Sequence, residues 1–337
     1  MRKRFRFIDL FAGIGGTRLG FERAGGNCVL TSEWDQYAEQ TYRENFKNAR
    51  THMTVQDVRD LHEEDIPDHE ILLAGFPCQP FSLAGVSKKN SLGRPHGFLD
   101  ATQGTLFFDV ARIINSKRPK AFLLENVKNL IAHDGGNTFR TILGVLENDL
   151  GYSVSYKVID SKPWVPQSRK RIYIIGMESG LPFDFDSLII PSSQPALGSI
   201  LHPQNGSEVP EPRYTSGKHG RVLSKYTLRD GTWSYLQKHA EVHRAKGNGF
   251  GYGLFDRSGV ARTLSSRYYK DGSEILIKRG NGYLNPRRLT PRECARLMGF
   301  PDSYHIPVSD SQAYKQFGNS VVVPVISELA SKIIKQI

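Results

Sequence analysis

One cysteine in the sequence is held in the way that a catalytic nucleophile has to be held. Cys78 lies between Pro77 and Pro80, soon after the apolar run 71–74, which is typical of a buried strand that ends in a turn. The two prolines fix φ and remove backbone donors, so the thiol is presented on a stiff loop. In an open α/β sheet, ligands bind at this edge. A lone cysteine is more often a buried structural residue, so the residues around it decide.

A carboxylate and two guanidinium groups are predicted to lie near this thiol. Glu125 follows the apolar run 121–124, and the carboxyl ends of parallel strands meet at one edge of a sheet. It could act as a general acid with a raised pKa, or only cap the next helix. Arg169 and Arg171 precede a strand predicted at 172–176, and they share one face if the chain is extended there. Together they would favour the thiolate and bind an anion or a carbonyl oxygen, unless they form a solvated basic loop.

The elements that position these groups also predict a small-molecule pocket. Residues 7–10 indicate a strand, 11–16 a glycine-rich turn and 17–24 a helix, an order that lets the backbone approach a ligand. The spacing is not Gly-x-Gly-x-x-Gly, so no dinucleotide fingerprint is indicated, and a plain tight turn has the same pattern. The strand that begins at Cys28 leads to Glu33, an acid suited to accept both hydroxyls of a ribose.

Three further residues would complete this pocket around a purine ring. Trp34 could lie against the ring, and Asp57 could accept a hydrogen bond from its amino group while Val58 packs on it. Each has a simpler alternative. Asp35, beside Trp34, is placed to cap a helix over 36–45, and an aspartate such as Asp57 is usually solvated at the surface.

The composition limits the class of protein. The chain has 337 residues, 39% hydrophobic and 23% charged, which is typical of a globular protein large enough for two domains. It contains no run of 18 apolar residues and no signal sequence, and its three distant cysteines predict neither disulfides nor a zinc site. We therefore expect a cytoplasmic protein without a membrane segment or a metal.

The charge favours a polyanionic partner. The net charge is +11, and basic residues are concentrated at 213–229, 238–246, 257–270 and 278–292. The second half of the chain is therefore expected to bind nucleic acid.

Six motifs, in order, resemble those of the DNA cytosine-5 methyltransferases, the bacterial restriction-modification enzymes of HhaI type. They are Phe11-Ala12-Gly13-Ile14-Gly15-Gly16, the segment 75–82 with its Pro-Cys-Gln, Glu125-Asn126-Val127, Gln167-x-Arg169-x-Arg171, the segment 288–301 and the segment 316–321. Each motif alone is weakly specific, whereas six in this order are highly specific. The resemblance extends over nearly the whole chain.

The resemblance implies an α/β fold, with a mostly parallel, doubly wound sheet that binds S-adenosylmethionine and a smaller, irregular target-recognition domain. We expect residues 1–187 and 315–337 to form the catalytic domain and 188–314 the recognition domain. The residues implied to bind S-adenosylmethionine are Phe11, Gly13, Gly15, Glu33, Trp34, Asp57, Val58, Pro77, Leu106, Asn319 and Ser320.

The implied reaction is methylation of cytosine at C5 in double-stranded DNA. Addition of the Cys78 thiolate at C6 would make C5 nucleophilic. Glu125 would donate to N3 and bind the exocyclic amine, while Arg171, with Arg169, would hold the O2 carbonyl. A stacked base is out of reach of these groups, so base flipping is expected, with the polar loop 83–104 closing on the substrate.

The segment 261–272 looks like the recognition segment of the Dcm and EcoRII type of methyltransferase, whose sites contain CC paired with GG. Its candidates for reading base edges are Arg267, Tyr268, Lys270 and Asp271. Phosphate contact is the more common role of each basic residue. Because the long extensions of those relatives are absent here, the central bases of the site stay open.

We expect a monomer that acts with a cognate restriction endonuclease encoded nearby. A tRNA cytosine methyltransferase would share the fold, but the arginine-rich second half resembles readers of DNA sites. A silent DNA-binding protein would not need Cys78, Glu125 and the two arginines, and a thymidylate-synthase-like thiol enzyme would not need Glu33 or the glycine turn.

Overall fold

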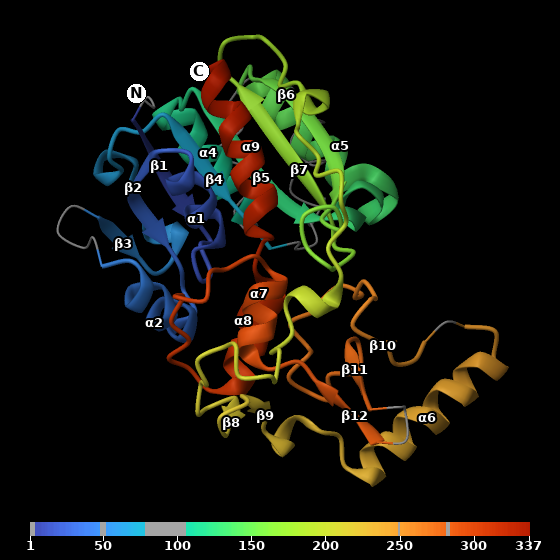
Figure 1. The fold of residues 1–337 in the computed structure, drawn as a ribbon. Coiled ribbons are helices and arrows are strands. Elements are labelled where there is room, and N and C mark those ends of the chain that lie inside the picture. The colour runs from blue at the N-terminus through green and yellow to red at the C-terminus, as the bar shows by residue number, and fades with distance from the viewer. Residues whose placement is uncertain (1–3, 48–51, 78–105, 249, 281–283) are drawn as a thin grey trace.

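A seven-stranded sheet forms the frame of the larger of two domains (Figure 1). The structure is a computed structural model that describes residues 4–47, 52–77, 106–248, 250–280 and 284–337. The strands are β1 Phe5–Leu10, β2 Gly26–Ser32, β3 Met53–Val55, β4 Ile71–Ala74, β5 Ala121–Val127, β6 Ser153–Asp160 and β7 Lys170–Met177. Their order is β3-β2-β1-β4-β5-β7-β6; β1 to β5 run parallel, and β7 is antiparallel to both neighbours. The predicted mostly parallel α/β sheet is confirmed.

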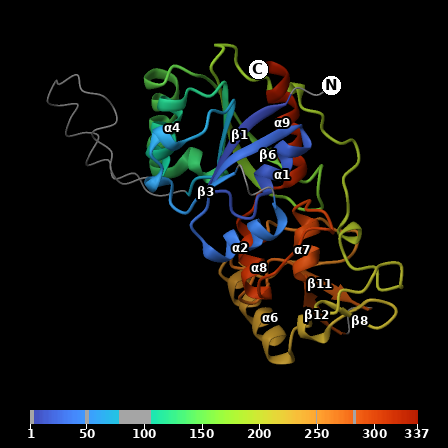
Figure 2. The same cartoon turned by 90° about the vertical axis from the view of Figure 1, so that its left-hand side faces the viewer.

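Helices cover both faces of this sheet (Figures 1 and 2). They are α1 Gly16–Arg23, α2 Gln36–Asn45, α4 Leu106–Lys117, α5 Asn137–Gly144 and α9 Val323–Gln336, and a π-helical turn, Val145–Asp149, extends α5. Successive strand residues point to opposite faces, so Phe7 packs in the core under α1 and α9 and Ile8 in the core under α4 and α5. Burial on both faces explains why these strands are short, continuous apolar runs.

The smaller domain has little regular structure, as expected for the second half. It contains β8 Thr215–Ser216, β9 Arg221–Val222, α6 Asp230–Ala245, β10 Leu254–Phe255, β11 Leu276–Arg279, β12 Leu284–Arg288, α7 Pro291–Leu297 and α8 Asp310–Asn319. Short 3-10 helices lie at Val58–Asp60, Glu63–Asp65, Phe185–Ser187, Leu197–Ser199 and Ser224–Tyr226, and Lys128–Gly136 is 3-10 helical with a kink at residues 133–135. The sequence did not predict α6, because Leu236 is its only buried residue and the helix has no clear apolar stripe.

Helix α8 connects the two domains. Gln316 donates to the carbonyl of Tyr37 at 2.8 Å and accepts from the hydroxyl of Thr41 at 3.0 Å, which fastens α8 to α2. The boundary expected at residue 315 falls inside this helix, so the division of the chain at 188 and 315 stays a prediction. The chain then returns to the sheet as α9, beside α1 (Figure 1).

One stretch, Asp310–Gln336, has the length and hydropathy of a helix that can cross a membrane. In the structure it forms two helices, α8 and α9, and apolar residues such as Ile326 and Leu329 are fully buried. A core helix of this kind passes the same test, so the stretch is weak support for a membrane span.

Candidate active site

The predicted site residues follow the carboxyl ends of adjacent parallel strands. The last residue of β1 pairs with the last residues of β2 and β4, and β4 pairs with β5 up to the residue before Glu125. The glycine turn, Glu33, Pro77 and Glu125 therefore come after neighbouring strand ends on one edge of the sheet, where open α/β sheets bind their ligands.

The turn after β1 has an unusual backbone. Phe11, Gly13 and Gly15 all have positive φ, of 57°, 56° and 76°. Such angles strain a phenylalanine, and strain of this kind is concentrated at functional sites. A Cβ at Gly13 would meet nothing within 4 Å, whereas one at Gly15 would lie 2.3 Å from the ring of Phe46. Gly13 therefore borders open space, while Gly15 is required for packing.

The carboxylate of Glu33 holds this turn against the end of β2. Its Oε2 accepts from the amide of Gly13 at 2.7 Å, and its Oε1 accepts from the amide of Asp35 at 2.8 Å. The residue is only 8% exposed, and burial raises the pKa of Glu33. Each oxygen keeps a free lone pair, which is what two vicinal hydroxyls of a ribose require.

The side chains expected around a purine ring are arranged less uniformly. Trp34 is 76% exposed and presents its ring to solvent, whereas Val58 is buried in the core. The guanidinium of Arg59 lies 2.5 Å from Asp57 and holds the pKa of that carboxyl below its usual value. Asp57 would have to leave Arg59 to bind a ligand. Asp35 caps α2 by accepting from two of its amides, as the simpler alternative predicted.

Ser320 lies against the glycine turn from the far end of the chain. A Cβ on Gly16 would lie 2.8 Å from the Ser320 hydroxyl. Asn319 is exposed beside it. Pro77 is exposed after β4, and Leu106, half-buried, begins α4. The end of α8 thus brings residues 319–320, which are expected to bind the cofactor, next to the glycine turn.

Glu125 and Arg171 form an ion pair at this edge. Nε of Arg171 lies 3.1 Å from Oε1 of Glu125, and the two side chains are 15% and 14% exposed. Burial raises the pKa of Glu125, against the opposing effects of Arg171 and Arg169. A Cβ on Gly75 would lie 3.7 Å from Oε2 of Glu125, so the carboxylate faces the beginning of the loop that carries Cys78. Cys78 itself lies outside the described residues.

Asn126 is a positioning residue to which the sequence assigned no role beyond its place in the motif 125–127. Its side-chain amide donates to the carbonyl of Phe76 at 2.8 Å, and its side-chain oxygen accepts from the amide of Val127. It therefore fixes the chain just before Pro77. A buried polar residue inside an apolar strand, next to Glu125, was the available signal.

Arg169 lies close enough to Arg171 and Glu125 for both charges to affect its pKa, but its hydrogen bonds run elsewhere. It precedes β7 and is only 3% exposed, and its guanidinium donates to the carbonyls of Leu264, Gly318 and Ser320 at 2.8, 3.0 and 2.7 Å. Burial lowers the pKa of Arg169 to about 9, which leaves the group charged at neutral pH. In this arrangement Arg169 binds backbone, and Arg171 is the arginine paired with Glu125.

The candidate DNA-reading residues divide into exposed and buried side chains. Arg267 and Lys270 are exposed and form no ion pair within the described chain, and Asp271 is half-buried and accepts from the amide of Ser273. The prediction that Tyr268 reads base edges does not fit its position in the structure. The residue is fully buried, and its hydroxyl donates to the carbonyl of Ile275 and accepts from the amide of Leu289, so it supports the segment from within.

Cys28 and Cys294 are free and buried. Among the described residues, no group of three or more His, Cys, Asp or Glu side chains is arranged to hold a metal ion.

Comparison with known proteins defines the class and then the family. The crystal structure of S. pombe Dnmt2 methyltransferase has the same fold, with a TM-score of 0.72, 18% identity and 99% of both chains covered. The family model for C-5 cytosine-specific DNA methylases matches residues 5–335. This chain belongs to that family and is a DNA cytosine-5 methyltransferase.

Two relatives are similar over almost the whole chain. The DNA-cytosine methyltransferase of Escherichia coli (strain K12) is 48% identical over 379 residues, covering 97% of this chain and 76% of that protein. The type II methyltransferase M.SsoII of Shigella sonnei is 49% identical over 337 residues, covering 98% of this chain and 80% of that protein.

Proposed function

We propose that this chain methylates C5 of a cytosine within a short, specific site of double-stranded DNA, with S-adenosylmethionine as the methyl donor. The observation that carries the proposal is the Glu125–Arg171 ion pair, which faces the start of the Cys78 loop on the same sheet edge as Glu33 and the open turn at Gly13. A type II methyltransferase among the relatives supports a role as the modification enzyme of a restriction-modification system.

The residues at the turn fit S-adenosylmethionine, which supplies an electrophilic methyl group when bound. Glu33 has free lone pairs that can accept from the ribose hydroxyls. Gly13 borders open space, so a ligand can approach the backbone there. Trp34 offers an exposed ring for the adenine. The remaining proposed contacts are Phe11, Gly15, Asp57, Val58, Pro77, Leu106, Asn319 and Ser320.

The proposed activation of cytosine divides the work between three side chains. The Cys78 thiolate adds to C6, and the ring electrons move toward N3 and C5. Glu125, whose pKa is raised by burial, donates its proton to N3, so that negative charge does not accumulate on the ring. Arg171 binds the O2 carbonyl and keeps Glu125 in place. After methyl transfer, a base removes the C5 proton and the Cys78 thiolate leaves C6.

The low exposure of Glu125 supports base flipping. Its side chain is 14% exposed, so a base stacked inside a duplex could not reach it. Extrusion of the target cytosine costs a few kcal/mol of stacking and pairing, which enzymes of this kind recover from contacts to the flipped base.

Arg267, Lys270 and Asp271 are the proposed readers of the site, which we expect to contain CC paired with GG. Arginine and lysine match the acceptors of guanine, and aspartate matches the amino group of cytosine, in the major groove. The exposure of Arg267 and Lys270 supports this assignment.

Base-resolution cytosine mapping in a methylation-deficient bacterium that expresses the chain tests the proposal. We expect methyl groups on C5 at one recurring short motif, and none with Cys78→Ser at equal expression. An unmethylated genome with folded protein present would reject the function. Methylation at a motif without adjacent C·G pairs would reject only the assignment of the recognition segment. We further propose that the enzyme acts as a monomer and that its methylation blocks cleavage by a cognate endonuclease.

A further inference from the structure

Among the described residues, the hydrogen bonds from the Arg169 side chain run to two distant segments. One Nη donates to Leu264 in the recognition segment 261–272, and the other donates to Gly318 and Ser320 near the glycine turn. Its buried Nε has no partner within the described chain. The hydrogen bonds of the guanidinium within the described chain therefore hold these two segments together.

The recognition segment is also joined to the chain around Arg169 by a continuous seam. The amide of Ala261 donates to the carbonyl of Pro166 at 2.8 Å, and the amide of Ser168 donates back to Ala261 at 2.9 Å. The Thr263 hydroxyl donates to the carbonyl of Ser168 at 2.8 Å. The side-chain oxygen of the fully buried Gln167 accepts from the amide of Leu264 at 2.7 Å.

The two segments also touch each other directly. A Cβ on Gly318 would lie 2.3 Å from the carbonyl oxygen of Ser265, so only glycine allows this approach. Ser320, two residues later, packs on the glycine turn at Gly16, and Arg171, two residues after Arg169, pairs with Glu125. The recognition segment, the candidate cofactor pocket and the catalytic pair thus meet around one guanidinium.

We propose that Arg169 is a positioning residue that couples binding of the DNA site to binding of the cofactor. The inference rests on the proposed function and assigns Arg169 no contact with the base. When one ligand orders its own segment, the guanidinium is fixed on that side, and the other segment loses less freedom when its ligand binds. Such coupling is reciprocal, because each ligand must change the affinity of the other by the same factor.

The variant Arg169→Lys distinguishes this positioning role from an effect of positive charge alone. A guanidinium is a planar fork that can serve both segments at once, whereas an ammonium is a single point charge on a flexible stem. Arg169→Lys keeps the positive charge, but its one nitrogen replaces two Nη atoms that each serve a different segment, so we expect the coupling between the two sites to fall.

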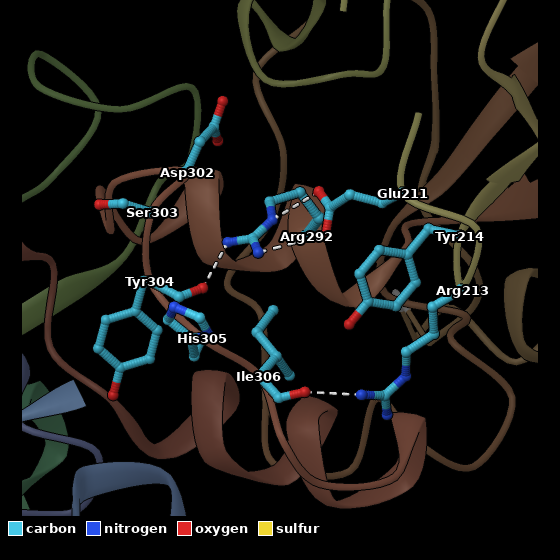
Figure 3. A pocket seen from close by; sticks show the side chains of 9 residues that line it. All are labelled: Glu211, Arg213, Tyr214, Arg292, Asp302, Ser303, Tyr304, His305 and Ile306. Atoms are coloured by element: carbon cyan, nitrogen blue, oxygen red, sulfur yellow. Dashed lines mark hydrogen bonds and ion pairs between the residues drawn. The ribbon is translucent and has the colours of Figure 1, made fainter. Parts of the chain in front are cut away.

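Arg213 provides a matched control at another joint of the smaller domain. It lines a cavity of about 290 Å³ with Glu211, Arg292 and residues 302–306, and its guanidinium donates to the carbonyl of Ile306 (Figure 3). It also donates to the carbonyl of Val308. Arg292 in the same cavity binds Glu211 and the carbonyl of Tyr304. Arg213 therefore also binds two backbone carbonyls, but neither lies in the recognition segment or at Gly318 and Ser320. The segment of Ile306 reaches the glycine turn, because the Tyr304 hydroxyl donates to the carbonyl of Ile14, so this control lacks only the link to the recognition segment.

The experiment measures the affinity for S-adenosylhomocysteine by calorimetry, with and without a saturating duplex that carries the mapped site. The converse titration measures duplex affinity with and without S-adenosylhomocysteine. In the wild type we expect each ligand to tighten the other by the same factor, of about 10 or more. In Arg169→Lys the factor falls below about 2, while each ligand alone binds within about threefold of wild type. Arg213→Lys keeps the wild-type factor.

Thr263→Val is a second, milder variant in case Arg169→Lys does not fold. It removes one seam bond without touching Arg169, and we expect an intermediate coupling factor. The inference would be overturned if Arg169→Lys or Thr263→Val kept the wild-type coupling factor, or if the wild type showed no coupling. Equal loss in Arg213→Lys would indicate general loosening of the domains. A large fall in kcat with coupling intact would make Arg169 a catalytic residue. None of these results affects the proposed function, which the methylation map tests separately.

Discussion

The Nε of Arg171 and the Oε1 of Glu125 lie 3.1 Å apart, across two antiparallel strands that meet at the edge of the sheet. Val127 of β5 pairs with Arg171 of β7, so the arginine reaches back along its neighbour to the carboxylate. Burial favours the protonated acid, while the arginine favours the carboxylate. The pair therefore combines a carboxyl that can carry a proton with a fixed cation beside it.

Replacing Glu125 with glutamine removes the transferable proton and keeps the shape. We expect kcat to fall by about 10² to 10⁴, the usual contribution of a general acid. Binding of S-adenosylhomocysteine is expected to stay within about threefold of wild type, since Glu125 is not a proposed cofactor contact. Single-turnover methylation of a duplex with the mapped site measures the first effect and calorimetry the second. A variant with wild-type kcat would remove Glu125 from the mechanism.

Asp9 predicts a specific dependence of stability on pH. The carboxyl is fully buried at the end of β1; Oδ2 accepts from the Thr17 hydroxyl at 2.6 Å, and Oδ1 has no partner within the described chain. Burial raises the pKa of Asp9 to about 7, from 3.8. Because the folded state binds the proton more tightly, this group makes the protein less stable as pH rises from about 4 to 7.

The isosteric variant Asp9→Asn removes that dependence, because an amide does not ionise. We expect the difference in unfolding free energy between variant and wild type to grow in favour of the variant from pH 5 to pH 8, by a few kcal/mol. Urea denaturation at four pH values measures it. Parallel curves at every pH would show that Asp9 stays ionised in the folded protein.

Elements with a clear local sequence pattern were predicted, whereas an element without one was missed. Strands β4 and β5 were predicted because burial on both faces leaves continuous apolar runs, and α2 was predicted because Asp35 caps it. Helix α6 was missed because it buries almost nothing. No helical spacing of apolar residues in the sequence indicated where this helix lies.

The role of Arg169 lay outside what a local pattern can show. The partners of its guanidinium lie 95, 149 and 151 residues further along the chain. The burial of Tyr268 was missed for the same reason, since its hydroxyl accepts from the amide of Leu289, 21 residues further along the chain. A motif identifies such residues as important, but only tertiary contacts distinguish a residue that touches the substrate from one that positions others.

Glu33 is predicted to control affinity for the cofactor. Glu33→Ala removes both proposed ribose contacts and the acceptor of the Gly13 amide. We expect S-adenosylhomocysteine to bind about 10² to 10⁴ times more weakly, because the two hydrogen bonds to a charged acceptor contribute about 1.5–3 kcal/mol each and every 1.4 kcal/mol or so is a tenfold change. Glu39→Ala is the control, since Glu39 is an acid on the neighbouring α2 that pairs with Arg43. Equal losses in the two variants would show that the effect of Glu33 is general.

Arg267 distinguishes reading of bases from binding of phosphate. As a base reader, Arg267→Ala loses about 1–3 kcal/mol of affinity for the mapped site but little for an unrelated duplex, so discrimination falls. As a phosphate contact, it would weaken both duplexes alike and reduce the slope of log K against log salt by about 1. We expect the first result, because Arg267 is exposed in the recognition segment and forms no ion pair within the described chain.

Duplex titrations at several salt concentrations distinguish base reading by Arg267 from phosphate binding. Lys278→Ala is the control, since its ammonium lies 3.9 Å from Asp256 outside that segment. A parallel loss on both duplexes would assign Arg267 to the DNA backbone and move the reading of the site to Lys270 and Asp271.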